Sequence, residues 1–251
     1  MNNISEKIKS GAVLSNAWMT SGSAWSAELV SKVGFDVMTI DAQHGLATDL
    51  SAILSMLQAM QSGKSVPFVR IPSTDAAFAM RMLDAGALGL ICPLIKTAAE
   101  VKEFVSASYY PPLGERSLGP FRASLYQENY FTSANENIAT LAMIETKESF
   151  DNLSEIASIE GLTGLYVGPW DLSISLGFSN VADFEDPKQL SIFEKIINEA
   201  EKNGKWAGIQ CPNPEIGLKM SKLGFKFITI YEDTVGIKLS AKADLKTFKL
   251  D

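Results

Sequence analysis

Short apolar runs alternate with segments of helical spacing along this chain of 251 residues, and this alternation constrains the fold more than any other feature. Runs that are apolar at nearly every position indicate strands buried on both faces, as in a parallel sheet that helices cover. Such strands are predicted at 11–18, 35–41, 66–72, 88–93, 141–145, 165–170, 205–210 and 227–231. The pattern predicts an α/β fold, a single (β/α)₈ TIM barrel over residues 1–251, with a short N-terminal helix around Ile4 and Ile8.

The segments between the runs carry helix signals. Thr97 with Glu100 predicts a capping box, and residues 147–159 have the spacing of one helix between two strands. The competing fold is a doubly wound sheet, which has a glycine fingerprint after its first strand. Residues 17–23 do not contain that fingerprint, so the barrel is favoured.

Composition narrows the class of protein. The chain is 46% hydrophobic with a formal net charge of −7 and no basic cluster, so neither nucleic acid nor an anionic membrane is an expected partner. No apolar run approaches the ~18 residues that span a bilayer. The first residues show no signal peptide, so a cytoplasmic location is predicted. Cys92 and Cys211 lie in apolar runs and are expected to be buried thiols.

Two of the predicted strands lead to a carboxylate. Glu145 ends one apolar run, and Asp171 comes just after the next. Neighbouring parallel strands end at one edge of the sheet, about 5 Å apart between backbones, so these side chains should lie close together. They repel each other unless a cation lies between them, and a divalent metal with oxygen ligands is the simplest cation. The alternative is that each carboxylate caps the following helix.

Other polar residues are predicted at the same edge, where barrel enzymes carry their active sites. His44, the only histidine, is either a catalytic base or a structural or exposed side chain. Arg70 lies in an apolar setting and needs an anionic partner, which is either a protein carboxylate or a substrate carboxylate. Gly168 lets backbone approach a ligand closely. Asp84 ends a predicted helix, where the helix dipole disfavours a carboxylate, so it is either specialised or simply solvated.

Residues 109–137 interrupt the alternation of strands and helices. A loop this long inside a compact domain is usually functional, as a lid or a subunit contact.

Six motifs, taken together, resemble the HpcH/HpaI class of metal-dependent pyruvate aldolases, relatives of the citrate lyase β subunit. They occur in the order of the family and cover nearly the whole chain. They are DAQHG at 41–45, PFVRIP at 67–72, LDAGA at 83–87, YPPLGER at 110–116, IET at 144–146 and GPWDLS at 168–173.

The resemblance implies reversible aldol cleavage of a 4-hydroxy-2-oxo acid to pyruvate and an aldehyde. It implies Glu145 and Asp171 as ligands of Mg²⁺, Mn²⁺ or Co²⁺. It implies His44 as a base that acts through a water, and Arg70 as the group that stabilises the enolate oxygen. Substrate binding is implied for Arg70, Gly168, Trp170 and Asp171.

The resemblance also implies that Asp84 raises the basicity of His44. An orthodox barrel, however, places the end of that helix on the face opposite His44. The pairing therefore needs a neighbouring subunit or an unusual chain path, and Asp41 is the local rival for this role.

Three positions depart from the residues that are common in the family. Gln43 stands where Glu is frequent, Met143 where Gln is frequent, and Trp170 where a small residue is common. Met143 shares an inward direction with Glu145, so a substrate hydrogen bond is expected to be missing. The Trp170 ring is expected to narrow the pocket while its backbone amide still serves the substrate. These departures affect the identity of the substrate more than the type of reaction.

The family further implies a homo-oligomer, a hexamer or trimer, whose closing helix docks on a neighbour. The apolar helix from Val235 is compatible with this, and equally with covering its own barrel. The alternative functions are a CoA-thioester lyase of the citrate lyase β or malyl-CoA lyase type and a non-catalytic metabolite-binding barrel. A lysine Schiff base is the rival aldolase chemistry. For this, Lys205 begins its strand at the wrong face, and Lys96 lies in a polar turn.

Overall fold

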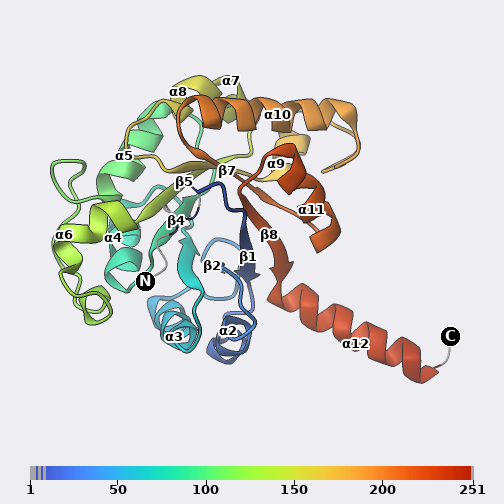
Figure 1. Cartoon of the computed structure of the whole chain (residues 1–251), viewed down its shortest axis with the longest axis horizontal. Coiled ribbons are helices and arrows are strands. Elements are labelled where there is room, and N and C mark those ends of the chain that lie inside the picture. The colour runs from blue at the N-terminus through green and yellow to red at the C-terminus, as the bar shows by residue number, and fades with distance from the viewer. Residues whose placement is uncertain (1–3, 5–6, 8–9, 250–251) are drawn as a thin grey trace.

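The chain folds into a closed barrel of parallel strands in the order β1-β2-β3-β4-β5-β6-β7-β8, so the predicted (β/α)₈ fold is confirmed (Figure 1). The computed structural model describes residues 4, 7 and 10–249. The strands are β1 Leu14–Met19, β2 Val37–Asp41, β3 Val66–Arg70, β4 Gly89–Cys92, β5 Ala139–Ile144, β6 Gly164–Val167, β7 Trp206–Gln210 and β8 Phe227–Glu232. They match the predicted runs because each strand is buried along most of its length, which is what an unbroken apolar run encodes.

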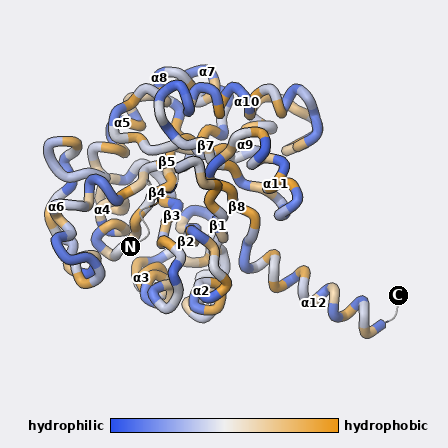
Figure 2. Tube along the Cα trace, viewed as in Figure 1, coloured by the Kyte–Doolittle hydropathy of each residue, from blue (hydrophilic) through white to orange (hydrophobic). Residues whose placement is uncertain are grey.

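Helices cover the outside of this barrel, and they are amphipathic rather than apolar all round (Figure 2). They are α2 Ala24–Ser31, α3 Leu50–Met60, α4 Ala76–Asp84, α5 Ala98–Ser108, α6 Tyr130–Asn137, α7 Lys147–Asp151, α8 Leu153–Ala157, α9 Pro169–Ser175, α10 Pro187–Lys202, α11 Pro214–Leu223 and α12 Asp233–Lys249. The predicted capping box is confirmed, because Thr97 and Glu100 exchange both capping hydrogen bonds at the start of α5.

Three segments differ from the sequence-based expectation or lie outside what is described. The single helix predicted at 147–159 is broken into α7 and α8 at Asn152, whose side-chain amide instead donates to the Lys96 carbonyl at 2.9 Å. The interrupted stretch at 109–137 contains α6 and a short 3₁₀ helix, Ala123–Leu125. Of the predicted leading helix, Ile4 is described and helical, whereas Ile8 lies outside the described residues.

The core has two parts. One lies between the strands and the surrounding helices, and the other fills the inside of the barrel. Inside, the rings of Phe68 and Phe227 stack with centroids 5.6 Å apart. Gly89 makes room for this pair, since a Cβ there would lie 2.3 Å from Phe68 Cζ. The barrel interior is therefore a packed core, and a ligand can enter only at its ends.

The last helix, α12, does not cover its own barrel. It runs away from the strands and ends far from them (Figure 1). Asp233 is its only residue described as buried. The apolar side chains of Ile237, Leu239 and Phe248 are all exposed. The possibility that this helix covers its own barrel is therefore wrong, and its docking on a neighbour stays a prediction.

Candidate active site

A cavity of about 550 Å³ opens at the carboxyl ends of the barrel strands. This is the face on which barrel enzymes place their chemistry, and the volume is in the usual range for a small-molecule site. The residues that line it come from the ends of β1, β2, β3, β6, β7 and β8, with Met143 from β5. They are Trp18, Thr20, Asp41, His44, Leu46, Arg70, Met143, Tyr166, Gly168, Trp170, Asp171, Gln210, Glu232 and Thr234.

Arg70 is paired with a protein carboxylate, which answers the question that the sequence left open. The β2–β3 register places Asp41 opposite Arg70, and the guanidinium donates from Nε to Oδ1 at 2.9 Å and from Nη2 to Oδ2 at 2.5 Å. Burial by itself raises the pKa of Asp41, but hydrogen bonding and charge from Arg70 outweigh it and hold that pKa below its ordinary value. Asp41 therefore remains ionised and fixes the orientation of the guanidinium.

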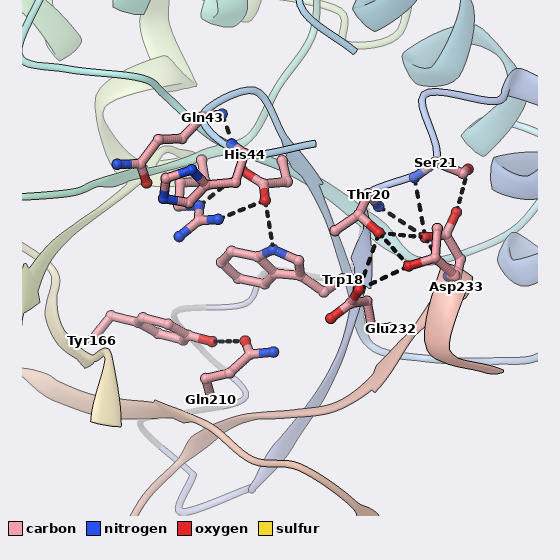
Figure 3. Close-up of polar contacts among 12 residues, drawn as sticks. Trp18, Thr20, Ser21, Gln43, His44, Tyr166, Gln210, Glu232 and Asp233 are labelled. Carbon is pink, nitrogen blue, oxygen red and sulfur yellow. Dashed lines mark hydrogen bonds and ion pairs between the residues drawn. The ribbon is translucent and has the colours of Figure 1, made fainter. Parts of the chain in front are cut away.

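Trp18 completes this cluster. Its indole Nε1 donates to Asp41 Oδ2 at 3.3 Å, and its ring lies 4.9 Å from the Arg70 Cζ. The other side of the indole stacks on Tyr166, with centroids 5.7 Å apart. Figure 3 shows the indole between the Gln43–His44 turn and the Tyr166 ring. An aromatic face beside the guanidinium leaves the cation charged but poorly hydrated, which suits the binding of an anionic oxygen.

His44 is an exposed residue at the rim of the same cavity. Asp41 Oδ1 accepts hydrogen bonds from the backbone N–H groups of Gln43 at 3.0 Å and His44 at 3.2 Å. Gly45 lets this turn close, because a Cβ there would lie 2.4 Å from the Asp41 carbonyl oxygen. Asp41 therefore holds the backbone of the turn, and the His44 imidazole forms no hydrogen bond with any described residue.

Glu145 follows β5 directly and is buried, with 3% of its surface exposed. Its Oε1 accepts a hydrogen bond from the backbone N–H of Leu94 at 2.6 Å. Leu94 has a φ of +53°, a left-handed conformation that is uncommon for a leucine and often found at functional sites. Thr146, not Glu145, caps α7, so the capping interpretation of Glu145 is wrong.

Asp171 lies in the first turn of α9 and lines the cavity. The β5–β6 register pairs Ile144 with Val167, so Glu145 and Gly168 leave the barrel side by side. Burial raises the pKa of Glu145 above its ordinary value, and the charge of Asp171 raises it further, against the Leu94 amide and Arg70. These effects destabilise the ionised form of Glu145, and a cation beside it would stabilise that form.

The residues present fit a divalent metal. A Cβ at position 168 would lie 2.7 Å from Glu145 Oε2, so the glycine leaves open the space beside that oxygen. Two carboxylates supply hard oxygen ligands of the kind that Mg²⁺ and Mn²⁺ prefer. In the described part of the chain no group of three or more His, Cys, Asp or Glu side chains is placed to hold a metal. The remaining ligands would therefore come from substrate and water.

Asp84 lies away from this cavity. It is the last residue of α4, and it pairs with the buried Arg116, whose Nη2 lies 2.6 Å from Asp84 Oδ1. Because α4 leads into the start of β4, its end is on the barrel face opposite His44. Within one chain, the carboxylate nearest to the His44 turn is Asp41.

Two of the three departures from the family line the cavity. Met143 is buried and lines the cavity, as expected from its inward direction. Trp170 is 38% exposed and lies edge-on to Phe184, with ring centroids 6.2 Å apart. It shapes the mouth of the cavity, whereas no lysine in the described part of the chain lines it. Lys205 Nζ instead donates to the carbonyls of Ile159 and Leu162 at the opposite face.

Sequence reasoning missed a set of residues at the ends of β1, β6, β7 and β8. They are Trp18, Thr20, Tyr166, Gln210, Glu232 and Thr234. Their strand-end positions were a usable signal, because alternate residues of a barrel strand point inward. Their polarity gave no signal of its own, since threonine, glutamine and glutamate are common at the ends of exposed loops.

Comparison with known proteins places this geometry in a family. The family described as HpcH/HpaI aldolase/citrate lyase matches residues 14–211. A hydroxypyruvate/pyruvate aldolase of Rhizorhabdus wittichii is 35% identical over 90% of this chain and 90% of its own. A 2-keto-3-deoxy-L-rhamnonate aldolase of Escherichia coli K12 is 32% identical over 93% of this chain and 88% of its own.

Solved structures agree with these sequence comparisons. A family protein from Burkholderia cenocepacia superimposes with a TM-score of 0.90 at 25% identity, covering 99% of this chain and 100% of its own. The matched region includes every strand from β1 to β7, and both Glu145 and Asp171. The chain belongs to the HpcH/HpaI aldolase/citrate lyase family.

Proposed function

We propose that the protein is a metal-dependent pyruvate aldolase that cleaves a 4-hydroxy-2-oxo acid reversibly to pyruvate and an aldehyde. The observation that carries the proposal is a pair of interacting carboxylates beside the Asp41-oriented guanidinium of Arg70: Asp171 lines the cavity, and its charge raises the pKa of the buried Glu145. Relatives that are aldolases by name and cover most of the chain support it.

We assign the two carboxylates to a divalent cation, Mg²⁺, Mn²⁺ or Co²⁺. When bound, it supplies Lewis acidity toward the carboxylate and keto oxygens of the pyruvate part of the substrate. Glu145 would hold the ion from a buried position, and the Leu94 amide orients its carboxylate. The exposed backbone beyond Gly168, including the Trp170 amide, is assigned to the substrate carboxylate.

During cleavage the C3–C4 bond breaks and its electron pair remains on C3 as an enolate. The C4 hydroxyl loses its proton and becomes the aldehyde carbonyl, and C3 later takes up a proton to give pyruvate. Arg70 holds positive charge where the enolate oxygen develops negative charge. Asp41 accepts from Nε and from one N–H of Nη2, so the N–H groups of Nη1 and the second N–H of Nη2 remain for substrate. Loss of one such donor typically costs about 10²–10³-fold in rate.

We assign His44 as the base that removes the C4 hydroxyl proton through a water. Its free imidazole at the cavity rim supports this role. In this proposal Asp41 positions the turn that carries His44. A role for Asp84 in raising the basicity of His44 then requires Asp84 to come from a second copy of the chain.

We further propose a homo-oligomer, a hexamer or trimer, in which α12 packs on a neighbour. The exposed apolar side chains of α12 support it. A cytoplasmic location remains a prediction. None of the described helices is both long enough and apolar enough to cross a membrane.

The test is a retro-aldol screen in which pyruvate release is coupled to lactate dehydrogenase, with a panel of 4-hydroxy-2-oxo acids and different divalent ions. We expect Glu145→Gln and Asp171→Asn each to abolish metal-dependent pyruvate release. Glu155→Gln, an exposed residue on α8, is the matched control and should keep full activity. Full activity in excess EDTA, or trapping of a pyruvate adduct by borohydride, would refute the proposal.

A further inference from the structure

The cavity has a second polar wall, on the side away from the metal carboxylates. Thr20, Gln210, Glu232 and Thr234 form it. Strand β7 separates β6 from β8 in the barrel order, and β8 pairs with β1. If pyruvate binds between the β5–β6 carboxylates and Arg70 on β3, then the β7–β8–β1 side faces the other end of the substrate. This wall is therefore placed to contact the aldehyde.

Hydrogen bonds orient the wall so that one acceptor and one donor are left for a ligand. Glu232 Oε1 accepts from the hydroxyls of Thr234 at 2.8 Å and Thr20 at 3.2 Å. Glu232 Oε2 accepts no hydrogen bond from the described residues. Gln210 Oε1 accepts from the Tyr166 hydroxyl at 3.0 Å, which leaves its amide N–H groups as donors. A ligand hydroxyl can donate to the former and accept from the latter.

The wall is held in place by a buried carboxylate behind it. Asp233 is fully buried and accepts hydrogen bonds from the backbone N–H groups of Thr20 at 2.8 Å and Thr234 at 2.9 Å. It also accepts from the hydroxyls of Ser21 and Ser26. Figure 3 shows Thr20 and Ser21 gathered around Asp233, with Glu232 beside Thr20 on the side of Trp18. The wall is thus ordered before any ligand arrives, which favours selectivity.

The charges around the cavity disfavour an anionic aldehyde. Arg70 is the only lysine or arginine among the described lining residues, and Asp41 balances it. Glu145 and Asp171 together would balance the charge of one divalent cation. Pyruvate then adds one negative charge, and Glu232 adds another at the aldehyde end. A semialdehyde carboxylate would meet like charge with no cation to pair it.

We propose that Glu232, with Gln210 and the two threonines, makes the enzyme select uncharged hydroxyaldehydes over semialdehydes that carry a carboxylate. The inference rests on the proposed function and names the class of its second substrate. Glu232 both accepts a hydrogen bond from the hydroxyl of the preferred aldehyde and repels the carboxylate of the competing semialdehyde.

The experiment measures kcat/KM for aldol addition of pyruvate to glycolaldehyde and to succinate semialdehyde with the full-length protein and Mn²⁺. We expect the wild type to prefer glycolaldehyde by roughly tenfold or more. Glu232→Gln should lower this preference roughly tenfold, chiefly through faster reaction of succinate semialdehyde. Glu232→Asp keeps the charge but shortens the side chain, so it should slow glycolaldehyde without gaining activity on the anion.

The matched control is Glu201→Gln, which removes one negative charge from an exposed position near the end of α10 and should leave the preference unchanged. Circular dichroism checks that each variant is folded. If Glu232→Gln does not fold, the comparison of wild type with Glu232→Asp is the test. A wild type that prefers succinate semialdehyde, or a preference that is the same in wild type and Glu232→Gln, overturns the inference.

A separate readout isolates the proposed function. Metal-dependent exchange of the pyruvate methyl protons with D₂O needs no aldehyde and is followed by proton NMR in the wild type. Absence of exchange counts against the aldolase proposal itself. Exchange together with an unchanged aldehyde preference in Glu232→Gln counts only against the role of the wall.

Discussion

Gly168→Ala is a test of how tightly the structure fixes Glu145, one of the two carboxylates proposed to hold the metal. The added Cβ would lie 2.7 Å from Glu145 Oε2, 3.0 Å from Glu145 Cβ and 3.1 Å from Met143 Cε. The shortest of these is about 0.7 Å inside the 3.4 Å at which ordinary contact begins. Gly168 has a φ of −94°, so the effect is steric contact with the carboxylate and not left-handed backbone strain.

The expected size follows from the tolerance of metal sites. Ligand distances in working sites vary by about 0.2 Å, so a displacement of about 0.7 Å removes Glu145 from good coordination. Disturbing the support of a ligand commonly costs 10–100-fold in metal affinity, or about 1.4–2.7 kcal/mol. We expect Gly168→Ala to weaken Mn²⁺ binding by that factor and to lower retro-aldol activity at limiting Mn²⁺. The free energy of unfolding should change by only about 1 kcal/mol.

Mn²⁺ affinity is measured by isothermal titration calorimetry, and the free energy of unfolding by urea denaturation. Gly119→Ala is the matched control, because its Cβ would meet only Asp84 Oδ2, at 3.4 Å. It should bind Mn²⁺ like the wild type. If Gly168→Ala also binds Mn²⁺ with wild-type affinity, then Glu145 Oε2 is not a metal ligand and the reasoning fails.

Three further changes test other parts of the structure. Arg70→Met leaves Asp41 buried without its partner and should lower the free energy of unfolding by about 3–5 kcal/mol, measured by urea titration. The double variant Arg70→Met with Asp41→Asn should lose less stability than Arg70→Met alone. Equal losses in the two variants would contradict the pairing. Burial alone raises the pKa of Asp233, but hydrogen bonds from Ser21 and its neighbours hold it below the ordinary value. The stability that Asp233 contributes is therefore complete above the unfolded aspartate pKa of about 3.9 and is lost as the pH falls through the lower folded value, so the stability difference from Asp233→Asn should shrink between about pH 5 and pH 2. Deletion of residues 240–251 should reduce the molar mass found by light scattering if α12 joins subunits; an unchanged mass would refute that role.

Much of the fold could be predicted because its signals are local. A strand buried on both faces has apolar residues at nearly every position. Every strand was located from that pattern within a few residues. The break at Asn152 was missed, and the partner that its side chain finds there, the Lys96 carbonyl, is far away in the sequence.

Part of the candidate site was also visible in the sequence. Glu145 and Asp171 follow neighbouring strands of a parallel barrel, and that topology alone brings them to one edge. The sequence likewise indicated that Asp84, at the end of a helix, belongs to the other face, where it pairs with Arg116.

The partner of each side chain was decided only by the tertiary structure. Arg70 required an anion, but the β2–β3 register determined that this anion is Asp41. Glu232 looked like an ordinary strand-end residue until the β1–β8 pairing set it opposite Trp18, at the cavity. Local sequence patterns fix backbone conformation and burial, whereas register and closure of the barrel fix which distant side chains meet. The sequence by itself therefore determined the strand pattern, whereas only the fold decided that Gln210 and Glu232 line the same cavity as Arg70.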